Sequence, residues 1–172
     1  DDIPNFILLP RAADELKIPF VASGGMADGR SLVAALALGA EGMNMGTRFM
    51  ATKEAPIHQG IKDKIVEMDE NQTQVIFRSY RNTARVYRNS ISEKVAEIEA
   101  AGGGFEEVHA YVSGANQEIA WTTGDIEAGM VTAGLSGAFV HDVPTCQEVI
   151  GPAAHLCDDL GIKHGVAHQS GL

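Results

Sequence analysis

Two short apolar runs, each ending in a glycine-containing loop, constrain the fold of this 172-residue chain more than any other feature. Residues 18–22 lead into Ser23-Gly24-Gly25, and residues 41–45 lead into Gly46-Thr47. Residues 28–39 separate the two runs and have apolar side chains at helical spacing. A helix that connects two buried strands is typical of a parallel sheet. The pattern therefore predicts a strand, a helix and a second parallel strand, and the fold class α/β.

The glycine loops indicate a site for a phosphate group. In a (β/α)8 barrel the active site lies at the carboxyl ends of the strands, where the loops after strands 7 and 8 often hold a phosphate. Backbone N–H groups bind the phosphate oxygens, and a Cβ would block their approach. A helix N-terminus would add free N–H donors, and the Thr47 hydroxyl could donate as well. The same glycines would also serve simple tight turns, so the residues alone leave both interpretations open.

A longer stretch of sequence carries a resemblance to a known family. Residues 18–30 read IPFVASGGMADGR, residues 34–42 read AALALGAEG, and residues 45–49 read MGTRF. Together they are similar to the FMN-phosphate region of the nitronate monooxygenase family, formerly called 2-nitropropane dioxygenase. Further segments that resemble the family's region after the barrel lie at residues 54–58, 81–86, 98–100, 124–125 and 133–134.

The resemblance implies the C-terminal part of a (β/α)8 TIM barrel, with strands 7 and 8, followed by a mostly helical extension. It implies that residues 1–54 are the C-terminal portion of the FMN-binding barrel and that residues 55–126 form the extension. Residues 127–172 would then be C-terminal helices that return to the barrel and end in a frayed tail. The implied contacts to the FMN phosphate come from five residues: Ser23, Gly24, Gly25, Gly46 and Thr47.

The activity that the resemblance implies is that of an FMN-dependent flavoprotein oxidoreductase, a monooxygenase that oxidises alkyl nitronates with O2. Reduction of a quinone by NAD(P)H on the same scaffold is the alternative, and a non-catalytic fragment is a third interpretation. The chain matches only about the last half of a family member, and the family's catalytic histidine belongs to a motif that would precede Asp1. No catalytic residue is therefore assigned, and we expect the chain alone to be an incomplete catalyst.

Composition limits the partners. The net charge is −10, which disfavours nucleic acid because an acidic surface repels phosphate backbones. The sequence has neither a basic cluster for anionic lipids nor an apolar run long enough to span a bilayer, and no signal peptide is recognised at its start. We expect a cytoplasmic protein that acts on a small molecule, a nitronate or a quinone with NAD(P)H. Two strands cannot close a barrel, and their exposed edges favour pairing in a homo-oligomer.

Other reactive side chains favour structural interpretations. Cys146 and Cys157 lack metal-ligand spacing and are expected to be free, buried or half-buried thiols. The six histidines also lack a strong metal motif, so we expect no metal site. Four arginines at positions 78, 81, 85 and 88 could form a surface for an anionic ligand such as the phosphate of NADH. Pairing of these arginines with neighbouring carboxylates is the favoured interpretation.

Local signals predict several further elements. Asp28 and Arg30 are expected to cap a helix and to pair with each other, and Gly39 is expected to end that helix. Capping boxes are predicted for Ser90 with Glu93 and for Thr145 with Glu148. Residues 73–77 are apolar and β-branched and predict a short strand. Residues 127–141 are rich in Ala and Gly and predict either a closely packed helix or a helix broken by glycine. The resemblance implies that Ala133-Gly134-Leu135 lies in a loop that approaches the flavin in the family, with Leu135 in place of the usual Gln.

Overall fold

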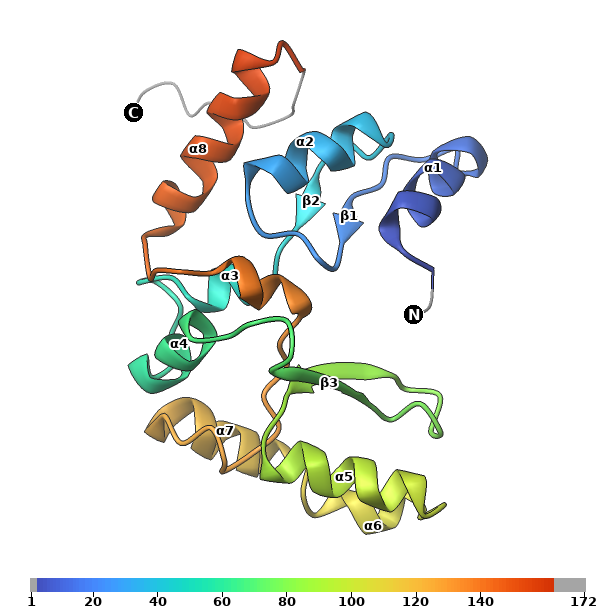
Figure 1. Ribbon diagram of the computed structural model, residues 1–172, viewed down its shortest axis with the longest axis vertical. Helices are drawn as coiled ribbons and strands as arrows, with labels where there is room; N and C mark the ends of the chain where they lie inside the picture. The colour runs from blue at the N-terminus through green and yellow to red at the C-terminus, as the bar shows by residue number, and fades with distance from the viewer. Residues whose placement is uncertain (1–2, 163–172) are drawn as a thin grey trace. The chain divides into compact units, whose positions relative to one another are not determined.

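A computed structural model describes residues 3–162 of the chain (Figure 1). The chain forms two compact units. Unit 1 combines Asp1–Met45 with Pro144–Leu172, and unit 2 is Gly46–Val143. Among the described residues, every helix is too short or too polar to cross a membrane. The predicted three-part division at residues 54 and 126 stays a prediction.

Unit 1 contains the predicted strand–helix–strand arrangement. Its elements are α1 (Asn5–Glu15), β1 (Ala22–Ser23), α2 (Gly29–Ala37), β2 (Met43–Asn44) and α8 (Cys146–Asp159). Strands β1 and β2 pair in parallel, with Ala22 opposite Met43 and Ser23 opposite Asn44. The strand prediction is therefore confirmed, although each strand is only two residues long.

Helix α8 belongs to the C-terminal segment of unit 1 and packs on α2 (Figure 1). Leu32 of α2 is buried together with Ala153 and Cys157 of α8. Small residues allow this close approach, because a Cβ at Gly29 would lie only 2.9 Å from the Cα of Ala153. The capping box of Thr145 and Glu148 at the start of α8 is confirmed. His164 and His168 lie outside the described residues, as does the predicted frayed tail beyond Ile162.

Unit 2 consists of helices around one antiparallel hairpin. Its elements are α3 (Thr47–Met50), α4 (Gln59–Val66), β3 (Thr73–Ile76), β4 (Ala84–Tyr87), α5 (Ser90–Ala100), α6 (Phe105–His109), α7 (Gly114–Thr123) and the 3-10 helix η1 (Leu135–Phe139). One buried apolar cluster includes Ile61 and Ile65 of α4, and a second includes Ile76 and Val86 of the hairpin with Val95 of α5. The predicted strand at residues 73–77 is confirmed, whereas the arginine-containing strand β4 was not specified by the sequence.

The predicted helix at residues 127–141 is wrong. The Tyr87 amide donates to the carbonyl of Val131 (2.8 Å), and Val86 forms an antiparallel bridge with Thr132. This segment is therefore extended against β4, and only η1 follows it. Gly129 also packs tightly, because a Cβ there would lie 2.5 Å from the carbonyl oxygen of Asn116.

The predicted capping box at α5 is displaced by one residue. Asn89 is the N-cap, and its side chain accepts a hydrogen bond from the Ser92 amide at 2.8 Å. Ser92 Oγ in turn accepts from the Asn89 amide at 2.9 Å. Asn is as strong an N-cap as Ser, and Asn89 is buried, with its amide group also donating to the carbonyls of Ile126 and Gly129. These hydrogen bonds to distant residues explain why Asn89, and not Ser90, is the N-cap of α5.

Candidate functional site

The first glycine loop leaves the sheet directly after β1. Gly24 has φ +83° and Gly25 has φ +75°, so two consecutive residues adopt a left-handed conformation that side chains disfavour. Apart from the glycine itself and its two chain neighbours, no atom of the described chain lies within 4 Å of the position that a Cβ would occupy at either glycine. The side-chain amide of Asn5 in α1 donates to the carbonyl of Gly24 at 2.7 Å, and this hydrogen bond holds the loop in place. The loop therefore has open space beside a backbone that is held in place.

The parallel pairing brings the two predicted strand ends together. Ser23 and Asn44 are the last residues of β1 and β2 and lie opposite each other, and Asn44 Nδ2 lies 3.4 Å from Ser23 Oγ. Both strands therefore end at the same edge of the sheet, as the sequence predicts. Gly46 follows β2 after a single intervening residue.

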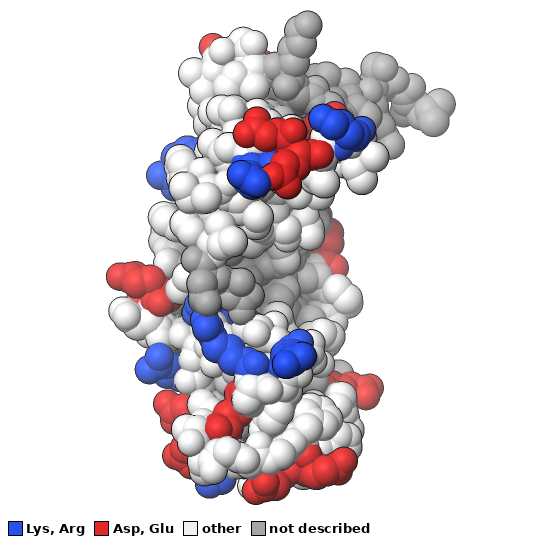
Figure 2. Space-filling view, turned by 90° about the vertical axis from the view of Figure 1, so that its right-hand side faces the viewer, with Lys and Arg blue, Asp and Glu red and all other residues white. Residues whose placement is uncertain are grey.

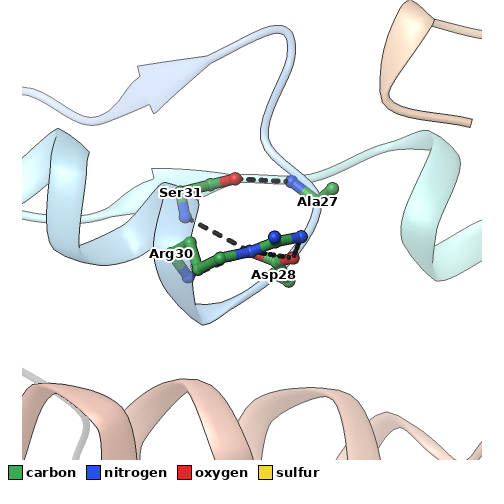
Figure 3. A network of polar contacts seen from close by, with 4 residues as sticks. All are labelled: Ala27, Asp28, Arg30 and Ser31. Atoms are coloured by element: carbon green, nitrogen blue, oxygen red, sulfur yellow. Dashed lines mark hydrogen bonds and ion pairs between the residues drawn. The ribbon is translucent and has the colours of Figure 1, made fainter. Parts of the chain in front are cut away.

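Helix α2 begins after the first glycine loop, and the amides of Arg30 and Ser31 in its first turn already donate to a side chain (Figure 3). The Asp28 carboxylate accepts from the amides of Arg30 (2.9 Å) and Ser31 (3.4 Å). It also accepts from the Arg30 guanidinium, and Ser31 Oγ accepts from the Ala27 amide at 3.2 Å. The capping and pairing roles predicted for Asp28 and Arg30 are confirmed. Because the Asp28 carboxylate accepts from the Arg30 and Ser31 amides, these two amides are not free donors for a phosphate.

The electrostatics of this cap favour the charged form of Asp28. The hydrogen bond from the Arg30 side chain is the largest cause that lowers the pKa of Asp28 below its usual value. Burial of the carboxyl group opposes this shift, while the Ser31 and Arg30 amides and the positive charge of Arg30 support it. The carboxylate is therefore a fixed negative group at the start of α2, which suits helix capping rather than proton transfer.

The second glycine loop begins unit 2. Gly46 has φ −92° and ψ −70°, and a Cβ there would meet no atom of the described chain within 4 Å. Thr47 is buried, and its hydroxyl oxygen accepts from the Gly134 amide at 2.8 Å. This acceptance uses a lone pair and leaves the O–H bond available to donate. Thr47 and Gly134 were both singled out by the resemblance, and the structure joins them directly.

Arg48 is a residue that the sequence analysis missed. Its side chain is 7% exposed and pairs with Asp142, whose own side chain is 70% exposed. An arginine that follows a glycine loop gives no local signal of burial, because its partner lies 94 residues further along the chain.

Three of the four arginines, Arg81, Arg85 and Arg88, differ from the favoured interpretation. Arg85 Nη1 donates to Thr73 Oγ1 at 3.1 Å across the two strands. Within the described part of the chain, Arg81, Arg85 and Arg88 form no ion pair with a carboxylate. A band of Lys and Arg side chains lies across the face shown in Figure 2. The alternative of an anion-binding surface thus stays a prediction.

The cysteines are as expected, since neither forms a disulfide within the described residues, Cys157 is buried and Cys146 is half-buried. Burial, supported by the nearby charge of Asp158, raises the pKa of the Cys157 thiol. Among residues 3–162, His, Cys, Asp and Glu do not gather in threes that could hold a metal ion. His58 instead caps α4, where its Nδ1 accepts from the Gly60 amide at 3.0 Å.

Similar solved structures agree with the fold. FabK from Thermotoga maritima has a TM-score of 0.83 and 30% sequence identity, over 94% of this chain and 51% of that chain. A nitroalkane oxidase from Streptomyces ansochromogenes has a TM-score of 0.72 and 23% identity, over 91% of this chain and 44% of that chain, and at this identity it supports the fold alone. The fold is the C-terminal part of a TIM barrel with a helical extension.

Similar curated proteins agree with the sequence resemblance. The probable nitronate monooxygenase of Staphylococcus saprophyticus is 39% identical over 97 residues, and that of Staphylococcus haemolyticus is 36% identical over 97 residues. Each alignment covers 56% of this chain and 27% of the relative, so the chain spans only a fraction of the length of these proteins. The nitronate monooxygenase family model matches residues 2–157. The chain therefore belongs to the nitronate monooxygenase family, a family of oxidoreductases.

Proposed function

We propose that the chain supplies the phosphate-binding part of an FMN-dependent oxidoreductase that oxidises alkyl nitronates with O2. The observation that carries this proposal is the parallel register of β1 and β2, which ends both strands at one edge beside an open glycine loop. Family membership supports the reaction class. Bound FMN would supply the redox chemistry, and the chain would bind and orient it.

The first loop suits the phosphate of FMN. The backbone at Gly24 and Gly25 is left-handed and has no side chain in front of it, so an anion can approach the N–H groups closely. Ser23 adds a hydroxyl group at the end of β1. Because the α2 amides are capped by Asp28, we assign the contacts to the loop itself rather than to the helix N-terminus.

The family resemblance also implies phosphate contacts for Gly46 and Thr47, in the second loop. At Gly46 neither the φ angle nor packing within the described chain requires glycine, since φ is negative and the Cβ position is open. Close approach of a ligand would explain glycine here. The Thr47 hydroxyl, fixed by the Gly134 amide, would donate its proton to a phosphate oxygen.

FMN titration of the purified chain tests the proposal. We expect a yellow complex with quenched flavin fluorescence, and about tenfold weaker binding for Gly46→Ala because the methyl group blocks the amide. Gly114→Ala is the matched control, since Gly114 also has an open Cβ position and lies in unit 2. A wild-type chain that takes up no FMN would overturn the proposal, as would equal affinities of the two variants.

The same loops would also serve reduction of a quinone by NAD(P)H. Anaerobic mixing of the FMN-loaded protein with NADH separates the two reactions. Rapid bleaching of the flavin absorbance would indicate reduction by NADH, and quinone reduction would then take the place of nitronate oxidation as the proposed activity. A stable yellow colour, followed by turnover with a nitronate and O2, would support the proposal.

A further inference from the structure

Arg48 is a buried cation in the first turn of α3, next to the proposed phosphate ligand Thr47. Its side chain is only 7% exposed. Taking a guanidinium group out of water is costly unless its donors are satisfied. An arginine in this position therefore calls for a role beyond packing.

The guanidinium group connects α3 to a distant segment of the same unit. Arg48 Nη1 donates to Asp142 Oδ1 at 3.1 Å, and Nη2 donates to the carbonyl oxygens of Asp142 (3.0 Å) and Ala51 (3.1 Å). Two of these three bonds go to backbone oxygens, whose positions are fixed by the chain. The planar group thus sets the position of residue 142 relative to α3.

Thr47 binds the other end of the same segment. Its hydroxyl oxygen accepts from the Gly134 amide at 2.8 Å, and η1 (Leu135–Phe139) lies between Gly134 and Asp142. Successive residues of α3 therefore hold both ends of residues 134–142. The Thr47 hydroxyl has a defined direction only while Gly134 stays in place, because a free threonine hydroxyl rotates.

One donor of Arg48 has no partner. Nε is buried and forms no hydrogen bond with the described residues. An unmet donor costs free energy, so the bonding geometry of Arg48 is not optimised for stability alone. The contact from Nη2 to the Asp142 carbonyl nevertheless holds residue 142 beside α3.

We propose that Arg48 is a positioning residue, which holds residues 134–142 against α3 so that the Gly134 amide fixes the Thr47 hydroxyl for an incoming phosphate. This inference rests on the proposed function for the role of Thr47 toward FMN. The positional part concerns the chain alone and can be measured without FMN.

Amide hydrogen exchange by NMR tests the positional part. In Arg48→Met we expect the Gly134 amide to exchange about tenfold faster, while the Val95 amide in the core of α5 is unchanged. Arg48→Lys, which keeps the charge but not the planar fork, should give an intermediate rate. An unchanged Gly134 rate would overturn the inference. If Arg48→Met does not fold, the Gly134 rate of Arg48→Lys, which loses the planar fork, decides instead.

FMN affinity tests the link to Thr47. We expect Arg48→Met to weaken FMN binding about tenfold, and to have no further effect once Thr47→Val has removed the hydroxyl. A merely structural role would weaken binding equally in both backgrounds and would overturn the inference. If the wild-type chain takes up no FMN, the proposed function fails, and the exchange rate of Gly134 still decides the role of Arg48.

Discussion

Substitution of Gly29 by alanine tests the packing of α8 on α2. A Cβ at Gly29 would lie 2.9 Å from Ala153 Cα and 3.3 Å from Leu156 Cδ2. Alanine is favoured over glycine in a helix by up to about 1 kcal/mol, whereas overpacking costs about 1–3 kcal/mol. The contact to Ala153 involves backbone, which cannot rotate away, so the unfavourable term should dominate. We expect a net loss of about 1–2 kcal/mol, or a fall in Tm of about 2–8 °C for a chain of this size.

Thermal unfolding followed by far-UV circular dichroism measures this effect, with Gly151→Ala as the control. Gly151 lies inside α8 in the same unit, and a Cβ there would meet only Gln147 Nε2 at 3.8 Å, which is an ordinary contact. The control retains the favourable propensity term alone and should raise the Tm by about 1–4 °C. If Gly29→Ala matched the control, α2 and α8 would not be in close contact and the reasoning would be refuted.

Three further expectations concern single side chains. Asp28→Ala should cost about 1 kcal/mol at neutral pH through loss of the α2 cap. Because the folded-state pKa of Asp28 is lowered, this stabilisation is complete above the unfolded-state pKa of about 3.9. It is lost as the pH falls through the lower folded-state pKa. A difference in denaturant unfolding between wild type and Asp28→Ala that persisted in strong acid would contradict this expectation. Iodoacetamide should modify Cys146 in the native protein and Cys157 only after unfolding, because Cys157 is buried and burial raises the pKa of its thiol. Mass spectrometry that found Cys157 labelled in the native protein would contradict this expectation. Glu99→Ala should destabilise the hairpin loop by about 1–2 kcal/mol, because the Glu99 carboxylate accepts from the amides of Phe77 and Ser79, and unchanged exchange of the Phe77 amide would argue against it.

The parts of the fold that the sequence predicts are those determined by neighbouring residues. Apolar runs bounded by glycine predict β1 and β2, and Asp28 predicts the start of α2, because each signal acts within a few residues. The parallel pairing follows from the helix between the strands. These local signals agree with one another, which is why the strand–helix–strand prediction is confirmed.

The extension could not be predicted in the same way, because distant residues determine its conformation. Residues 127–141 are rich in Ala and Gly and predict a helix, but the Tyr87 amide donates to the Val131 carbonyl and fixes an extended segment beside β4. The hairpin loop includes Phe77 and Arg81 at positive φ, which non-glycine residues adopt only under tertiary constraint. The carboxylate of Glu99, 22 residues beyond Phe77, supplies part of that constraint.

For the candidate site, the sequence predicts ligand-binding residues better than it predicts the residues that support them. Thr47 was singled out, and the structure adds that its hydroxyl is fixed by Gly134. Arg48 was missed, since only the folded chain brings Asp142 to it. Exposed arginine is the default expectation, so a buried one is identified from tertiary contacts alone.

The φ angle and the space at the Cβ position show, for each glycine, whether the fold itself requires glycine or whether a ligand would explain it. Gly39 has φ +96°, and a Cβ there would lie 2.5 Å from the Cβ of Ala13, so the fold alone explains it. Gly24 and Gly25 have positive φ but open space, so the turn explains them and a ligand would be compatible with them. At Gly46 neither reason applies within the described chain, because φ is −92° and the space is open. A bound anion would therefore account for glycine most directly at Gly46, which makes this position the sharpest test of the phosphate assignment.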